Sequence, residues 1–342
     1  TLPFAKYKVD SSGNFSKMSD FNAAVYDSIT HLFMLAAQEN ILVSNEMIFD
    51  MFRDPDFFSA CEGSVNDVSK LQTRINKAKE VVWIATFISN YIDKVNEQWN
   101  EVDILLEKAS EVESTELSLY DAICRSATIL IVAHMEGFLK GVSKNIISDY
   151  LCMEFKYLPM PLKKTYCGKH IFGCDKDTKE YNERITSLMS DFETSSDFKI
   201  SSEPFLSNRN KNPKPDVLCQ YSFKLGVKNI FKNLNESFFD SVFSNTDAEI
   251  KKLLNSLIAS TKVKVENFPY NVRQGIYRTR TTNYNGRSMW QTFLDDLNEK
   301  RHKIVHGNDF VNSTNVQELS RLKNKVQILQ YGYLLIILSH LN

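Results

Sequence analysis

Glycine and proline are both missing from residues 64–136, although the whole chain has 11 glycines and 8 prolines. These two residues interrupt helices most strongly, so their absence over so long a stretch indicates helix. Apolar residues recur there at steps of three and four, from Val68 to Ala85 and again from Ile92 to Leu106. We therefore predict a continuous helix of about 40 residues, overwound near the short step between Ile92 and Val95, that packs along another helix of this chain or along the same helix of a second copy.

An excess of either charge is absent as well. The 41 Lys and Arg residues against 42 Asp and Glu give a net charge of -1, so nucleic acid can be attracted only by a local patch. The longest apolar run, residues 328–341, is shorter than the roughly 18 residues that span a bilayer, and we expect no membrane segment. Cysteines are scattered without the spacing of a disulfide framework, which predicts reduced thiols and a cytoplasmic protein.

The motifs of several large enzyme classes are also absent. The sequence has no Gly-rich phosphate loop, no G-x-S-x-G elbow and no Cys-His signature. Nucleotide hydrolysis and acyl transfer therefore have no support in the sequence.

The pattern of apolar residues predicts an all-α protein built as a helical bundle. Residues 1–110 form a helical N-terminal region that includes the long, coiled-coil-like helix, and residues 111–342 form the bundle. Five of the eight prolines fall within residues 156–216, which we interpret as a loop-rich insertion. The helices expected in the bundle cover residues 119–151, 217–243, 246–260, 288–306 and 316–341.

A basic segment, RHKIVHG at residues 301–307, lies at the end of the penultimate predicted helix. Arg301 falls on or beside the apolar stripe, where a guanidinium is costly unless it meets an anion or carbonyl groups. His302 and His306 are four residues apart and share a face, whereas Arg301 and His306 lie about 140° apart around a straight helix. They converge only if the helix frays at Gly307, or if two copies of the chain line one cleft.

Arginine and histidine without a metal suit the cleavage of RNA through its own 2′-hydroxyl. Histidine as a residue type exchanges protons near neutral pH, and arginine stabilises the charge that grows on the phosphate. The plainer interpretation is an ordinary helix end, whose basic side chains complement the helix dipole.

Arg301, the polar His302 directly after it, and His306 reproduce the Rx4-6H signature, so that the segment resembles the HEPN superfamily. The central helix SATILIVAHMEGFLK and the long apolar last helix are similar to that family too, from about residue 112 to the end. The resemblance implies a helical homodimer with a composite cleft and a metal-independent endoribonuclease without cofactor, often a bacterial toxin or anti-phage effector. It also implies that Arg301 and His306 are catalytic and that His302 supports them. A regulatory partner such as an antitoxin fits this role.

A second basic stretch precedes this helix, because no acidic residue occurs between Asn267 and Leu294. Its arginines could contact phosphates and its tyrosines could stack on unpaired bases. A solvated loop that pairs with acids elsewhere is the alternative. The candidate RNA-binding residues are Arg273, Arg278, Arg280, Arg287, Tyr277, Tyr284 and, from the motif helix, Lys303.

Two metal sites and one different function stay open as alternatives. His302 and His306 have the spacing of a helical zinc pair, but Lys303 takes the place of the expected glutamate. Cys167, His170 and Cys174 could hold structural zinc with a fourth ligand from Cys152, Asp175 or Asp177, although ordinary reduced cysteines are the simpler interpretation. The alternative function is a non-catalytic helical interaction module with a vestigial motif.

Overall fold

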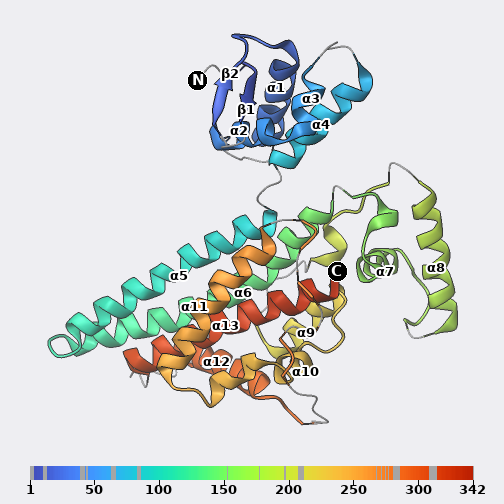
Figure 1. The fold of residues 1–342 in the computed structure, drawn as a ribbon. Helices are drawn as coiled ribbons and strands as arrows, with labels where there is room; N and C mark the ends of the chain where they lie inside the picture. Colours follow the sequence, from blue (N-terminus) through green and yellow to red (C-terminus); the bar gives the residue numbers. More distant parts are fainter. Residues whose placement is uncertain are drawn as a thin grey trace. The chain divides into compact units, whose positions relative to one another are not determined.

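The fold is divided into two compact units, Thr1–Ala85 and Thr86–Asn342. The structure is a computed structural model, shown as a ribbon in Figure 1, and each unit is described by itself. It describes residues 4–10, 14–38, 43, 45–62, 67–82, 86–151, 153–176, 178–195, 198–206, 212–266, 268–270, 272–273, 275, 277–279, 286–307 and 314–341.

The first unit packs short helices beside a small antiparallel hairpin that the sequence analysis missed. Its elements are β1 (Tyr7–Val9), β2 (Phe15–Lys17), α1 (Ala23–Gln38), α2 (Asn45–Arg53), α3 (Pro55–Ala60) and α4 (Val68–Val82). Val25, Ile29, Leu32 and Phe57 are fully buried in its core. The guanidinium of Arg74 is buried with them and donates to the carbonyl of Ala60 at 2.9 Å.

The predicted continuous helix is wrong, because α4 ends at Val82 and α5 (Phe87–Val112) begins a new helix. The side chain of Thr86 caps α5 by accepting from the amide of Ser89 at 3.0 Å. Asp149 accepts from the amides of Phe87 and Ile88 at 2.7 and 3.2 Å, and Tyr270 donates to the same carboxylate. These contacts from distant residues start a helix where no glycine or proline marks a boundary.

The division between the units consequently follows Ala85 and not residue 110, the boundary that we predicted. α5 belongs to the bundle and pairs with α6 (Leu117–Tyr150) through a short connection. Tyr91 lies against the α6 backbone and donates to the carbonyl of Gly137 at 3.2 Å. A Cβ at Gly141 would come within 2.1 Å of the Tyr91 hydroxyl, so this close approach requires glycine.

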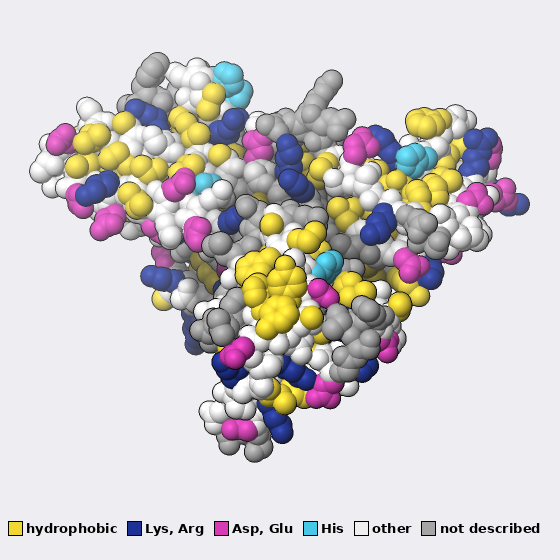
Figure 2. Space-filling view, turned by 90° about the horizontal axis from the view of Figure 1, so that it is seen from above, with side chains coloured by type: hydrophobic (Ala, Val, Ile, Leu, Met, Phe, Trp, Pro, Cys, Tyr) yellow, Lys and Arg dark blue, Asp and Glu magenta, His cyan; other side chains and the backbone are white. Residues whose placement is uncertain are grey.

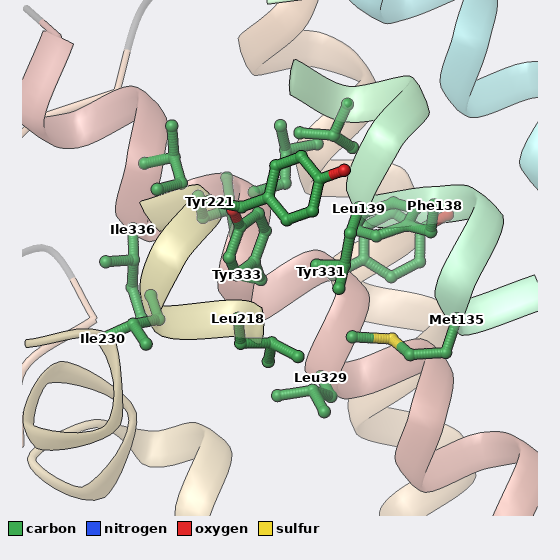
Figure 3. Packing of buried hydrophobic residues seen from close by; sticks show 14 of the residues in the cluster. Met135, Phe138, Leu139, Leu218, Tyr221, Ile230, Leu329, Tyr331, Tyr333 and Ile336 are labelled. Atoms are coloured by element: carbon green, nitrogen blue, oxygen red, sulfur yellow. The ribbon is translucent and has the colours of Figure 1, made fainter. Parts of the chain in front are cut away.

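The second unit is a helical bundle, and the predicted all-α class is confirmed. Figure 3 shows apolar side chains of α6, α9 (Pro215–Lys224), α10 (Ile230–Asn235) and α13 (Val316–Leu341) pointing toward one another. Met135 and Phe138 of α6 lie there with Leu218 of α9 and with Leu329 and Ile336 of α13. The principal bundle helices besides α5 and α6 are α9, α10, α11 (Asp247–Val265), α12 (Met289–Val305) and α13.

α6 has the length and apolar composition of a membrane span, and among the described residues it is the only such helix. Its Ile131, Val132 and Met135 are fully buried within the bundle. His134 of the same helix packs its ring edge-on against Trp99, and burial lowers the pKa of this histidine. α6 therefore has the environment of a core helix.

The helix predicted at residues 217–243 is also wrong, since the chain forms α9, α10 and the 3-10 helix η3 (Phe238–Phe243) instead. Gly226 ends the first piece with φ +93°, and its backbone lies against Pro161, where a Cβ would come within 2.4 Å. Asn229 then caps α10 by accepting from the amide of Lys232. A left-handed glycine and a capping asparagine thus mark this break, and Pro161 packs against the glycine.

The predicted insertion contains ordered helices as well as loops. Its elements are η1 (Phe155–Tyr157), α7 (Met160–Lys169), α8 (Lys179–Thr194) and η2 (Glu203–Phe205), which precede α9. Phe192 and Phe198 stack at 4.0 Å between ring centroids, and Phe155 and Tyr166 meet them edge-on. Aromatic packing inside the segment joins these helices to the core of the second unit.

Candidate functional site

α12 presents the basic segment at its C-terminal end, and both ends of this helix are well defined. Ser288 and Gln291 form a reciprocal capping box at the start, and Trp290, Leu294 and Leu297 bury one face. At the other end Gly307 takes φ +68° and its amide donates to the carbonyl of Ile304 at 3.2 Å. The predicted stop at Gly307 is confirmed, because a left-handed residue there favours glycine.

Arg301 is half-buried on this helix, beside the apolar face as its spacing suggested. Its Nη1 donates to Oδ1 of Asn212 at 3.0 Å, a residue 89 positions earlier in the chain. The sequence analysis did not single out Asn212, and nothing in the local sequence could have placed it next to α12. The acceptor is a neutral amide, so the charge of Arg301 is oriented but not neutralised.

His302 and His306 lie together, both exposed, with 4.2 Å between their ring centroids. His306 is the C-cap residue with φ -92° and ψ 8°, and its amide donates to the carbonyl of His302 at 3.0 Å. Within the described part of the chain, no direct contact joins Arg301 to either histidine. The two imidazoles therefore form one accessible pair, and among the described residues no hydrogen bond joins the guanidinium to them.

The other cations near this end of α12 have partners. Lys303 pairs with Glu299 at 2.9 Å, and this contact lowers the pKa of that carboxyl. Lys300 donates to the Thr314 hydroxyl at 3.1 Å. On the face drawn in Figure 2, Lys and Arg side chains are interspersed with Asp and Glu. Because the chain as a whole has a net charge of -1, RNA would meet a local group of cations at α12 and not a field of one sign.

The basic stretch before α12 is only partly available for RNA. Tyr277 was predicted to stack on bases, but it is buried and its hydroxyl bonds to that of Ser339. Arg278 approaches the buried Glu236 at 3.7 Å, and Arg287 pairs with Asp295. These contacts match the alternative in which the arginines pair with acids.

Of the remaining candidates in this stretch, Arg273 is exposed. Arg280 and Tyr284 lie outside the described residues.

The zinc alternatives gain no geometric support from the described residues, among which no group of three potential metal ligands comes together. Cys167 is buried, and burial raises the pKa of its thiol to about 12, which disfavours the thiolate that a metal needs. His170 is exposed and packs its ring against Tyr166. Cys152 and Asp177 lie outside the described part of the chain.

The fold and site together define a helical-bundle protein with an exposed Arg-His motif at the end of a bundle helix. Comparison with family models assigns this bundle: the model of the family described as RiboL-PSP-HEPN matches residues 93–331. The chain therefore belongs to this HEPN family, as the resemblance of its motif predicted. No curated protein and no solved structure gave a match.

Proposed function

We propose that the protein is a metal-independent endoribonuclease whose active site lies at the C-terminal end of α12. The observation that carries the proposal is a cation held by a neutral amide on the same helix end as two exposed imidazoles. Arg301, His302 and His306 are also the residues that fit the Rx4-6H signature of the family to which the chain belongs. Lys303 of the same helix is paired with a carboxylate instead.

The chemistry needs one proton to leave and one to arrive. The 2′-oxygen of the RNA attacks the adjacent phosphorus and loses its proton to a base, while the bond to the 5′-oxygen breaks and that oxygen gains a proton. The products are a 2′,3′-cyclic phosphate and a 5′-hydroxyl. His306 transfers protons in this step, and Arg301 stabilises the charge on the non-bridging oxygens. His302 supports His306 through the contact of their rings.

A homodimer completes the site in this proposal. Arg301 makes no contact with the histidine pair within one described chain, so groups from two copies in one cleft would supply both functions to one phosphate. Arg273 and Lys303 are among the exposed candidates for further contact with the RNA. We further propose a cytoplasmic role as a toxin or anti-phage effector that is held in check by a regulatory partner.

The decisive experiment compares Arg301→Ala and His306→Ala with matched variants in a cleavage assay on single-stranded RNA. We expect either substitution to lower the cleavage rate by at least about 100-fold, the usual contribution of a proton-transferring or charge-stabilising group. His170→Ala is the control for His306, because His170 is also an exposed C-cap residue, at the end of α7. Arg184→Ala is the control for Arg301, since it removes an exposed arginine paired with Glu180 on α8.

The reaction should proceed unchanged in EDTA and leave cyclic phosphate ends. Cleavage that survives both Arg301→Ala and His306→Ala would refute the site, and cleavage that EDTA abolishes would refute the mechanism. If the purified wild-type dimer cleaves no RNA and its overexpression does not arrest bacterial growth, the non-catalytic interaction module is the better description.

A further inference from the structure

The contact between Arg301 and Asn212 joins the candidate active site to the end of the insertion. Asn212 is exposed, but the segment that carries it is anchored. Pro213 is buried, and its carbonyl accepts from Nδ2 of Asn298 at 3.2 Å. The amide of Lys214 donates to the carbonyl of Asn212 at 2.7 Å, immediately before α9 begins at Pro215.

Asn298, which binds the carbonyl of Pro213, belongs to α12. It lies three residues before Arg301, so the two side chains share one side of the helix. Its side chain is 7% exposed, and Nδ2 also donates to the carbonyl of Leu294 at 2.7 Å. The segment at Asn212 and Pro213 is therefore attached to α12 at two successive points, one buried and structural, the other at the motif arginine.

Arg301 has a side-chain amide as its acceptor, whereas three other cations of the bundle are paired with carboxylates. Arg321 of α13 pairs with Asp247 at 2.9 Å, Arg287 pairs with Asp295, and Lys303 pairs with Glu299. Each of these partners is a carboxylate, which orients the basic side chain and also cancels its positive charge. The side-chain amide of Asn212 orients the guanidinium of Arg301 without cancelling its charge. The remaining N–H groups of the guanidinium can then bind a phosphate.

We infer that Asn212 is a positioning residue, which orients the guanidinium of Arg301 toward the scissile phosphate while preserving its full charge. This inference rests on the proposed ribonuclease function. The end of the insertion then belongs to the active site, because the buried hydrogen bond from Asn298 to the carbonyl of Pro213 fixes the position of Asn212. A residue far from the motif in sequence thereby controls the geometry of the motif arginine.

The first test is a split between kcat and KM. Asn212→Ala should lower kcat about tenfold and leave KM nearly unchanged, because the cation remains and only its orientation is lost. Asn212→Gln keeps an amide acceptor at this exposed position and should restore most of the lost kcat. A merely structural role would change the melting temperature, which we expect to stay constant in both variants.

The second test uses charge. Asn212→Asp would give Arg301 a carboxylate partner, so kcat should fall below that of Asn212→Ala. Affinity for a 2′-O-methyl oligoribonucleotide, which cannot be cleaved at its blocked 2′-oxygen, should also fall, with a salt slope reduced by about one. Asn182→Asp is the matched control, because it places the same charge on α8, where Asn182 bonds within its own helix to Thr178.

The outcomes separate this inference from the proposed function. If Arg301→Ala abolishes cleavage but Asn212→Ala has the kcat of the wild type, the positioning role is refuted and the ribonuclease stands. If Asn212→Asp is no worse than Asn212→Ala, the neutral character of the acceptor does not matter and the inference also fails. If Arg301→Ala cleaves like the wild type, the ribonuclease proposal itself is refuted.

Discussion

Two groups of polar side chains in the second unit lie at helix ends and differ mainly in burial. At the start of α5, Asp149 is 6% exposed and accepts from two backbone amides and from Tyr270. At the end of α12, His302 and His306 are exposed and Arg301 has one neutral partner. The hydrogen bonds of Asp149 are thus satisfied inside the protein, whereas the side chains at the end of α12 keep donors and positive charge that a ligand can bind.

This difference in burial distinguishes a group that stabilises the fold from a group that can bind a ligand. A buried carboxylate is tolerated because three donors satisfy it, and removing it would leave those donors without partners in the interior. An exposed cation or imidazole contributes little to stability, because water replaces its contacts at small cost. Substitutions at the two helix ends should therefore act on different measurements, in the order that follows.

The largest effect on stability is expected from Asp149→Ala. It leaves the amides of Phe87 and Ile88 and the Tyr270 hydroxyl without their acceptor, which should lower the free energy of unfolding by about 3 kcal/mol. Urea unfolding followed by tryptophan fluorescence in a Trp83→Phe background would report on this unit, since the other two tryptophans, Trp99 and Trp290, belong to it.

Asp93→Ala is the control for that measurement. Asp93 also lies on α5, but its side chain is 49% exposed and pairs with Lys262 at 3.2 Å. Its loss should cost no more than about 0.5 kcal/mol. Equal effects of the two substitutions would contradict the distinction between the buried and the exposed group.

The next effect is a dependence of stability on pH. Burial raises the pKa of Asp149 to about 6, above the value of about 3.9 in an unfolded chain. The folded state therefore binds more protons between these values, and the stability due to this group is full below about pH 3.9 and lost as the pH rises through about 6. From pH 4.5 to 7 the loss should be about 2 kcal/mol in the wild type.

Asp149→Asn removes the titration and should flatten this part of the profile. The measurement is the difference between the two proteins in their free energies of unfolding at each pH. A profile that is the same for both would show that another group is responsible.

A smaller effect on stability is expected at Tyr277, a candidate for RNA binding that is buried in the core. Tyr277→Phe removes the hydroxyl that bonds to Ser339 and should lower the free energy of unfolding by about 1 kcal/mol. Tyr157→Phe is the control, because Tyr157 is 62% exposed. If both variants are as stable as the wild type, the buried hydroxyl bond contributes nothing.

The smallest effect on stability is expected from the site variants themselves. Arg301→Ala and His306→Ala should each change the free energy of unfolding by less than about 0.5 kcal/mol, even where they abolish cleavage. Thermal unfolding by circular dichroism would check this. A loss of several kcal/mol would instead make the end of α12 a structural feature like the group around Asp149.

Much of the bundle could be predicted because its helices carry strong local signals. α12 has a capping box at Ser288 and a glycine stop at Gly307, and α13 is almost continuously apolar near its end. One failure occurred where a distant residue decides a boundary, because Asp149 binds the first amides of α5 in a stretch without glycine or proline. The other occurred at 217–243, where Gly226 with φ +93° and the cap at Asn229 are local signals of the break.

The candidate site shows the same division. Arg301, His302 and His306 were found from their spacing, because spacing along a helix determines which side chains are neighbours. Tyr277 was misplaced because its alternation with arginines resembles a binding loop, and only packing against α13 shows that it is buried.

The sequence by itself determined the all-α class, the ends of α12 and the identity of the motif, since helix periodicity and caps are properties of neighbouring residues. Tertiary structure alone decided that Asn212 holds Arg301, that Asp149 starts α5, and that the unit boundary lies after Ala85. Those features depend on contacts between residues tens of positions apart. Such contacts form only when the whole bundle has buried its core.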